Sequence, residues 1–262
     1  MVFYISVPLS RFEESADIIE REQLLPEIRM TDVNFMMSLA EDSLDRLKRI
    51  IDEKSFSIFT HGPFFGLDAA SLDRNISEYS LRCLIHGLEI TKALGGEVMV
   101  IHTGYLPQFS RGGRRHWFRN WAERMPPVIE MASESGITLA LENTWDDRPE
   151  VLLHLADLLP GDEVRFCLDT GHVNVFSRVP LGRWLKVIGE KVIALHLHDN
   201  DGISDDHLQP GKGTFNFGEL FTYFRKSDTM PLLDLEVDIQ IARMGREYLE
   251  RILRGIGGSL EV

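Results

Sequence analysis

The stretch VIALHLHDN, from Val192 to Asn200, begins as an apolar, β-branched run and ends in two histidines and an aspartate. Short apolar runs that are bounded by turn residues are typical of buried strands. The segment that follows, up to Gly213, adds a third histidine, three further aspartates and three glycines. An ordinary packed helix or strand does not need this composition. The stretch therefore predicts a strand that ends at a functional site.

Seven further apolar runs of the same kind are separated by amphipathic helical patterns. They are VFYISVP, LPEIRM, SFSIFTHG, EVMVIHTG, ITLALEN, VRFCLDTGH and LLDLEV. Eight strand–helix repeats in 262 residues have the size and order of a closed (β/α)8 barrel. We therefore predict an α/β fold, with one TIM barrel domain over residues 1–262 and its active site at the C-terminal mouth of the strands. A doubly wound open sheet is the competing fold.

Helix-end signals lie between these runs. The helical pattern over residues 71–95 closes on a glycine, and the pattern over 148–161 has Pro149 in its first turn and Pro-Gly as its stop. The proline pair at 126 and 127 interrupts another helical segment. We expect that helix to be kinked there or to be preceded by an extra turn, because proline removes a helical hydrogen bond.

Composition narrows the class of protein. The chain is 44% hydrophobic and 26% charged, and it has no Pro/Gly/Ser-rich linker, no basic leader and no apolar run of membrane-spanning length. We expect a cytoplasmic protein without a membrane partner. Cys83 and Cys167 have no paired spacing, so they predict buried apolar positions and neither a disulfide framework nor a thiolate zinc site. The net charge of −13 disfavours nucleic-acid binding, although bound divalent ions would reverse the local field in a cleft.

Six of the predicted strands carry a potential metal ligand at or near their C-terminal end. In chain order these residues are His61, His102, Glu142, Asp169, His196 and Glu236. A single histidine at a strand end is more often a hydrogen-bonded core residue, but six ligand types in successive strands would meet at the mouth of a barrel. We expect His172, Asp205 and His207 on loops leaving the same mouth. The remaining histidines, His86, His116 and His154, fall in helical patterns and predict no functional role.

Charge and ligand chemistry indicate a metal. Carboxylates inside apolar strands are costly to bury unless they are paired or bound to a metal. Imidazole and carboxylate ligands without thiolate suit Zn²⁺, Mn²⁺, Co²⁺ or Fe²⁺.

These motifs resemble the xylose-isomerase-like barrel superfamily, which includes sugar-phosphate isomerases and epimerases and the endonuclease IV class of abasic-site nucleases. The resemblance covers essentially the whole chain and rests on THGPFF, VIHTG, LALENT, FCLDTGH, HLHDNDG, DDHLQPGKG and LEVD. It implies that the shared metal is bound by Glu142, Asp169, His196 and Glu236. In the endonuclease branch, the ligands of further metals correspond to His61, His102, His172, Asp205 and His207. The expected cofactor is roughly one to three divalent ions of zinc, manganese or cobalt.

The resemblance implies a sugar or sugar-phosphate isomerase or epimerase. Glu142 and Glu236 would remove and return a proton beside a carbonyl through a metal-stabilised enediolate. One alternative is a multi-zinc phosphodiesterase acting on abasic-site DNA, and another is a barrel that binds a metal and a small molecule without turnover. Residues 31–45 and 62–73 contain no Lys or Arg, and Phe64 stands where the endonucleases have a tyrosine. A nucleic-acid partner is therefore disfavoured.

Several residues are candidates for substrate contacts. The SRGGRR segment contains Arg111, Arg114 and Arg115, which could bind one phosphate or carboxylate or could form a solvated charged loop. Phe64, Phe65 and Trp145 could provide an apolar wall for a sugar or could cap the core. His198 shares strand parity with His196, so it could contact substrate or hydrogen-bond within the barrel. Lys212 is a further candidate. The sequence leaves the oligomeric state and the identity of the sugar open.

Overall fold

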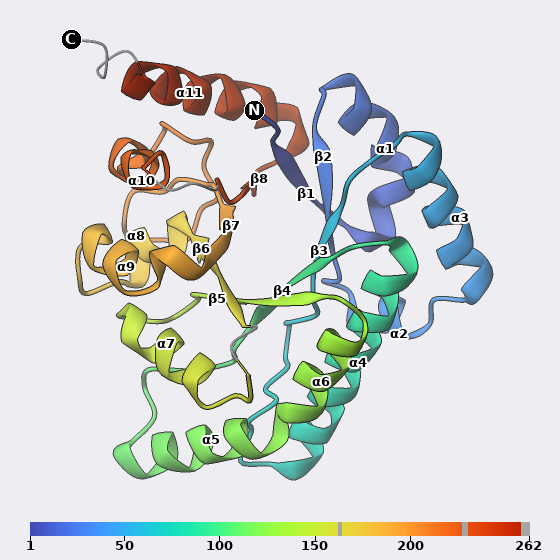
Figure 1. Cartoon of the computed structure of the whole chain (residues 1–262), viewed down its shortest axis with the longest axis vertical. Coiled ribbons are helices and arrows are strands. Elements are labelled where there is room, and N and C mark those ends of the chain that lie inside the picture. The colour runs from blue at the N-terminus through green and yellow to red at the C-terminus, as the bar shows by residue number, and fades with distance from the viewer. Residues whose placement is uncertain (162–163, 227–229, 258–262) are drawn as a thin grey trace.

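The eight strands form a closed barrel. The computed structural model describes residues 1–161, 164–226 and 230–257, and its parallel strands follow one another around the ring in chain order (Figure 1). They are β1 Tyr4–Pro8, β2 Leu25–Arg29, β3 Phe59–His61, β4 Val98–His102, β5 Thr138–Glu142, β6 Arg165–Asp169, β7 Val192–His196 and β8 Leu232–Leu235. Pairing of Tyr4 with Asp234 and of Ile5 with Leu235 closes the ring. The predicted (β/α)8 barrel is confirmed, and the open sheet is not found.

Helices surround the strands on all sides (Figure 1). They are α1 Phe12–Arg21, α2 Val33–Met37, α3 Glu41–Glu53, α4 Arg74–Leu94, α5 Arg111–Arg124, α6 Pro126–Glu134, α7 Pro149–Asp157, α8 Thr170–Phe176, α9 Leu181–Ile188, α10 Phe217–Phe224 and α11 Ile239–Gly257. Gly95 ends α4 in the left-handed region, with φ of 84°, as its position in the sequence predicts. The proline pair divides the predicted helix into α5 and α6, and the two meet at Met125.

The barrel interior is layered. Side chains alternate between the two faces of each strand, so every second residue points into the barrel. The lower interior layer is apolar and consists of Tyr4, Phe59, Val100, Ala140, Cys167 and Ala194. Cys83 and Cys167 are both buried and free, as predicted. The interior residues nearer the C-terminal strand ends are polar, and they form the floor of the mouth.

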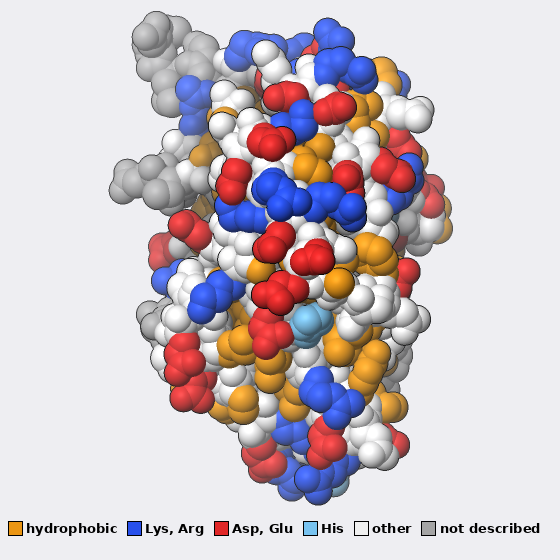
Figure 2. Space-filling view, turned by 90° about the vertical axis from the view of Figure 1, so that its right-hand side faces the viewer, with side chains coloured by type: hydrophobic (Ala, Val, Ile, Leu, Met, Phe, Trp, Pro, Cys, Tyr) orange, Lys and Arg blue, Asp and Glu red, His pale blue; other side chains and the backbone are white. Residues whose placement is uncertain are grey.

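The outer surface mixes charges of both signs. Figure 2 shows the flank that lies on the right of Figure 1, where α1 and α3 cover the barrel. Basic and acidic side chains alternate across it, with apolar atoms between them. Among all described residues, no helix combines the length and apolar character needed to cross a membrane.

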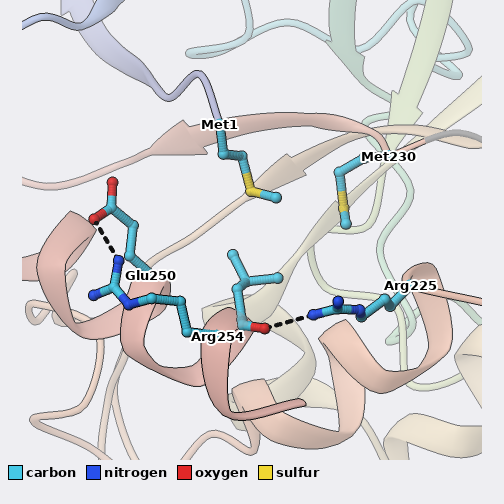
Figure 3. A pocket seen from close by; sticks show the side chains of 6 residues that line it. Met1, Arg225, Met230, Glu250 and Arg254 are labelled. Atoms are coloured by element: carbon cyan, nitrogen blue, oxygen red, sulfur yellow. Dashed lines mark hydrogen bonds and ion pairs between the residues drawn. The ribbon is translucent and has the colours of Figure 1, made fainter. Parts of the chain in front are cut away.

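A hollow of about 600 Å³ lies at the opposite end of the barrel from the mouth, and we call it the lower hollow. It is lined by Met1, Arg225, Met230, Glu250, Leu253 and Arg254 (Figure 3). The Arg225 guanidinium donates to the Leu253 carbonyl at 2.7 Å, and Arg254 donates to Glu250 at 3.5 Å. The polar groups that line this hollow thus bind one another, and Met1, Met230 and Leu253 provide its apolar part.

Candidate metal centre

The strand ends bring the predicted ligands together at the mouth. Donor atoms within 4.8 Å of one another form a central group of Glu142, Asp169, His196 and Glu236. A second group consists of His61, His102 and Glu142. Two overlapping outer groups contain Asp169, His172 and His198, and His198, Asp205 and His207. All nine predicted ligands lie in these groups, and Glu142 and Asp169 each belong to two of them.

His196 is the hub of the central group. Its Nδ1 atom lies 3.3 Å from Glu142 Oε1, 3.5 Å from Glu236 Oε2 and 3.8 Å from Asp169 Oδ2. Its Nε2 atom donates to Glu27 Oε1 at 3.0 Å, so Nδ1 of the neutral ring carries a lone pair. His196 Nδ1 and Glu236 Oε2 are buried without a hydrogen-bond partner among the described residues. A cation at this point would satisfy both atoms.

Three outer histidines have their tautomer set by backbone carbonyls. Each Nδ1 atom lies within hydrogen-bond distance of a carbonyl oxygen, which can only accept, so Nδ1 carries the hydrogen. The pairs are His61 with Gly62 at 2.8 Å, His172 with Asn143 at 2.8 Å and His207 with Glu236 at 2.9 Å. The Nε2 atom of each neutral ring is therefore an acceptor. Backbone-anchored histidines of this kind commonly bind metals through the other nitrogen.

These Nε2 atoms face carboxylates. His61 Nε2 lies 2.9 Å from Glu142 Oε2, while His172 Nε2 and His207 Nε2 lie 3.2 and 3.4 Å from Asp205 Oδ2. Two acceptors at such distances repel each other unless a proton or another cation lies between them. The donor set therefore fits divalent metal ions.

The shifted pKa values of the cluster also indicate that it favours a bound cation. Burial opposes ionisation of Glu142, but the charges of His102 and His196 outweigh it and hold its pKa well below the usual value. Burial also opposes protonation of His172, yet neighbouring carboxylates, first Asp169, hold its pKa well above normal. Burial also opposes ionisation of Asp169, but the neighbouring His172 and His198 charges outweigh it and lower its pKa to about 2. The carboxylates thus remain charged and strongly favour a cationic neighbour.

Two of the three residues predicted on loops lie there. Asp205 and His207 belong to the connection between β7 and α10, and His207 adopts a left-handed φ of 48°, which is strained for a side chain of its size. The predicted loop position of His172 is wrong, because the residue lies in the first turn of α8. Asp169 caps this helix, and its Oδ1 accepts from the His172 amide at 2.7 Å. The cap positions His172 over the mouth.

His198 contacts two of the candidate ligands, which its alternation with His196 along the strand does not by itself predict. Its Nε2 atom lies 3.0 Å from both carboxylate oxygens of Asp169, and its ring stacks on His207 at 3.9 Å. Its Nδ1 atom is buried and finds no partner among the described residues. A Cβ at Gly171 would lie 2.0 Å from this ring, so the backbone can pass His198 only at a glycine.

Three residues of the site were missed by the sequence reasoning, namely Glu27, Arg29 and Asp234. Glu27 accepts from His196 and from the Ser6 hydroxyl, and Arg29 Nη1 donates to Glu236 Oε1 at 3.1 Å. Asp234 is fully buried with no partner among the described residues, and burial, reinforced by the Glu27 charge, raises its pKa well above normal. The signal was present, since Glu27 and Asp234 are charged residues within apolar runs.

A mouth cavity of about 450 Å³ opens above the cluster. Its lining includes His102, His172, Asp205, His207 and Glu236 together with Phe64, Phe65 and Trp145, so the predicted aromatic wall lies beside the candidate ligands. A neighbouring hollow of about 440 Å³, which we call the polar hollow, lies beside the ends of β1 and β8. Arg29, His207 and Glu236 line both spaces.

The predicted basic contacts lie elsewhere. Arg111, Arg114 and Arg115 are exposed in the first turns of α5, so the segment is helical and is not a loop. Arg114 donates to the Pro107 carbonyl at 3.3 Å. Lys212 is exposed in the connection before α10. None of these four residues is among the described residues that line the mouth cavity or the polar hollow.

The remaining histidines lie on helices as predicted, with His86 on α4, His116 on α5 and His154 on α7. His86 pairs with Glu89 at 2.8 Å, and His154 packs edge-on against Phe118. Neither His86 nor His154 belongs to a group of potential metal ligands among the described residues.

Comparison with known proteins identifies relatives of the whole barrel. A model of the xylose isomerase-like TIM barrel family matches residues 16–252. An uncharacterized protein of Methanocaldococcus jannaschii is 27% identical over 223 residues, which are 82% of this chain and 76% of that protein. Fructoselysine 3-epimerase of Escherichia coli O157:H7 is 27% identical over 158 residues, 56% of this chain and 55% of that enzyme.

Solved structures share the same architecture. A Thermus thermophilus protein soaked with ZnCl2 superimposes with a TM-score of 0.82 at 27% identity and covers 100% of both chains. A D-tagatose 3-epimerase-like protein superimposes with a TM-score of 0.88 at 24% identity, over 99% of this chain and 100% of its own. At the latter identity the likeness concerns the fold alone.

Proposed function

This chain belongs to the xylose isomerase-like TIM barrel family, and on that premise we propose that it is a divalent-metal-dependent sugar isomerase or epimerase. The observation that carries the proposal is the pair of buried, unpartnered donors His196 Nδ1 and Glu236 Oε2 within a group of four ligand-type residues. The similarity to fructoselysine 3-epimerase supports a sugar-derived substrate.

The central group supplies the ligands in this proposal. Glu142, Asp169, His196 and Glu236 are the residues we expect to hold the ion. A bound divalent ion would position adjacent oxygens of an α-hydroxy carbonyl substrate and stabilise the charge of its enediolate. Glu27 keeps the hydrogen of His196 on Nε2 and so leaves Nδ1 available as a ligand.

Proton transfer falls to the two glutamates. Glu236 Oε2 has no hydrogen-bond partner among the described residues, while Arg29 orients the carboxylate through Oε1. Glu142 is ionised and buried, because its pKa is held low by neighbouring histidine charges despite burial. One glutamate, as the carboxylate, removes the proton from the carbon that bears the hydroxyl, and the other, as its conjugate acid, delivers a proton to the neighbouring carbon or to the opposite face.

Hydrogen exchange tests this proposal. A metal-loaded sample is incubated in D2O with each D-ketohexose, and deuterium at the carbon beside the carbonyl is followed by NMR. We expect exchange in the wild type and a loss of about 10²–10⁴-fold in Glu142→Gln and in Glu236→Gln. Glu53→Gln, at the exposed end of α3, is the matched control and should exchange normally. Equal exchange in all four proteins would remove the two glutamates from the chemistry.

A metal-dependent phosphodiesterase is the second candidate function. The observation that favours it is the convergence of the outer ligands, which could hold further ions. Arg29 is the one Lys or Arg among the described residues lining the mouth cavity, and it is bound to Glu236. A duplex requires several such contacts, so we place this function second.

His207→Ala distinguishes the two functions. The variant should lower the metal stoichiometry if an outer ion binds, and a multi-metal nuclease would then lose its incision of an abasic-site duplex. An isomerase that uses the central ion alone should keep most of its ketose exchange. Salt-sensitive, metal-dependent incision by the wild type would promote the phosphodiesterase. Full metal occupancy without either activity would favour a barrel that only binds its ligand.

A further inference from the structure

We propose that this site prefers a ketose that carries an apolar group over the free sugar and over a sugar phosphate. The inference rests on the proposed isomerase or epimerase function and names the substrate class. It is drawn from the chemistry of the two spaces that meet at Arg29, His207 and Glu236.

One side of the mouth cavity is an apolar wall. The wall consists of Phe64, Phe65, Leu106, Trp145 and Phe176, contributed by three loops and α8. Phe65 is 65% exposed, Trp145 48% and Leu106 40%. Large apolar side chains that remain exposed around one cavity indicate a binding site, because burial against a ligand is the usual way to remove them from water.

The wall begins directly beside the candidate ligands. Phe64 packs on the His102 ring at a centroid distance of 4.2 Å and on Phe65 at 4.3 Å. Phe176 lies 4.6 Å from Trp145 and 6.0 Å from His172. The rings are therefore held in place before a ligand arrives. An apolar group that reaches them must be attached close to the reacting part of the sugar.

The charges of the cavity disfavour a phosphate. Asp68, Asp205 and Glu236 line it, and the guanidinium of Arg29 is bound to Glu236. Apart from Arg29, no Lys or Arg is among the described residues that line the cavity, so a phosphate beside the wall would find no free guanidinium or ammonium group there. The arginines of α5 lie outside the described lining of the cavity. An uncharged apolar group needs no cationic partner.

In this proposal the polyol end of the substrate binds in the polar hollow. Its described lining includes Ser6, Arg11, Ser15, Asp238 and Gln240, which offer hydrogen bonds to hydroxyl groups. Because Arg29, His207 and Glu236 line both spaces, one elongated ligand can extend across the candidate metal centre. Its polyol end then lies in the polar hollow and its apolar group against Trp145 and Phe65.

The test compares substrates that differ at one end. Each D-ketohexose is offered to the metal-loaded protein as the free sugar, as its phosphate ester and as its benzyl ether, with the substituent at C1 or at C6. Deuterium exchange measures turnover. We expect kcat/KM for one benzyl ether to exceed that for the free sugar by about tenfold to a hundredfold, mainly through KM, because a remote apolar anchor stabilises ground and transition states alike.

Trp145 provides an independent binding signal. Trp117, Trp121 and Trp184 are buried, whereas Trp145 is 48% exposed, so a ligand on the wall changes the emission of Trp145 above all. Trp145→Ala should reduce the preference for the benzyl ether by about tenfold, and Trp145→Phe should retain most of it while losing the fluorescence change. Met244→Ala removes an exposed apolar side chain from α11 and should retain the preference.

The possible results test the substrate preference and the isomerase or epimerase activity separately. A free sugar or phosphate ester turned over as well as the benzyl ethers, with an unchanged ratio in Trp145→Ala, would overturn the inference and leave the isomerase intact. Binding of an ether without exchange would support the apolar subsite and contradict the isomerase function. Neither exchange nor a fluorescence change with any compound would overturn both.

Discussion

The mouth cavity and the lower hollow are spaces of similar size at opposite ends of one barrel. The lower hollow is the larger, about 600 Å³ against about 450 Å³. Its polar groups nevertheless bind one another, as in the Arg225 contact with the Leu253 carbonyl (Figure 3). The mouth contains buried atoms without a partner among the described residues, including His196 Nδ1, His198 Nδ1 and Glu236 Oε2. Unsatisfied buried groups, and not volume, identify the functional end.

Strand direction explains the contrast. All eight strands are parallel, so their C-terminal ends converge on the mouth. The N-terminal ends of the strands lie at the opposite end of the barrel, where Met1, Met230 and Leu253 line the lower hollow. Three variants, from the largest expected effect to the smallest, test whether the two ends differ as this comparison requires.

Asp169→Asn should have the largest effect. Asp169 belongs to both the central and an outer ligand group, and the amide removes a negative charge while it still can cap α8. We expect the affinity for Mn²⁺ or Zn²⁺, measured by calorimetry, to fall about a hundredfold or more. Arg254→Ala in the lower hollow is the control and should bind metal like the wild type. Equal losses in both proteins would erase the distinction between the two ends.

Glu27→Ala should have the next largest effect. Glu27 accepts the Nε2 hydrogen of His196 and is not one of the four residues of the central ligand group. Its loss frees the ring to rotate or to change tautomer, so we expect metal affinity to fall about 10–100-fold. Glu27→Gln retains an acceptor oxygen and should recover most of the affinity. An affinity unchanged in Glu27→Ala would show that His196 needs no such support.

Asp146→Asn concerns stability and should have the smallest effect. Asp146 is buried in the connection after β5, and burial raises its pKa from 3.8 to about 7. The folded protein then holds a proton that the unfolded chain releases, so the free energy of unfolding falls as pH rises through this range. The fall between about pH 5 and pH 8 should be smaller in the variant by about 1–3 kcal/mol, measured by urea unfolding.

Asp45→Asn, on the exposed surface of α3, is the matched control for this measurement and should follow the wild type. An identical pH profile in Asp146→Asn and the wild type would mean that the Asp146 carboxyl stays ionised within the fold.

The sequence predicts the barrel and the ligand cluster for the same physical reason. Glu142 and Asp169 are charged residues at the ends of apolar runs, which is where a parallel barrel opens its mouth. Glu27 and Asp234 carry the same signal, but each is followed two positions later by another charged residue, Arg29 or Glu236, which lies closer to the mouth. The helical position of His172 depends on a cap by Asp169, which is a tertiary detail of the β6–α8 turn.

Only part of the apolar wall follows from the sequence, which predicts Phe64, Phe65 and Trp145 but neither Leu106 nor Phe176. Phe64, Leu106 and Trp145 come from three separate loops, and their convergence depends on loop conformations that periodicity does not describe. The arginines of SRGGRR follow β4 as expected, but α5 already begins at Arg111 and carries them outside the described lining of the mouth cavity. Sequence order gives the end of the barrel to which a loop belongs, and packing decides which side chains enter the cavity.

The metal content of the wild-type protein tests the central claim most directly. The chain is purified without added metal, equilibrated with Mn²⁺, Co²⁺ or Zn²⁺, freed of excess ion by gel filtration and measured by elemental analysis. We predict roughly one to three ions per chain, because the unpartnered donors at the mouth require positive charge. A wild-type chain that is folded and retains none of the three metals would contradict the account.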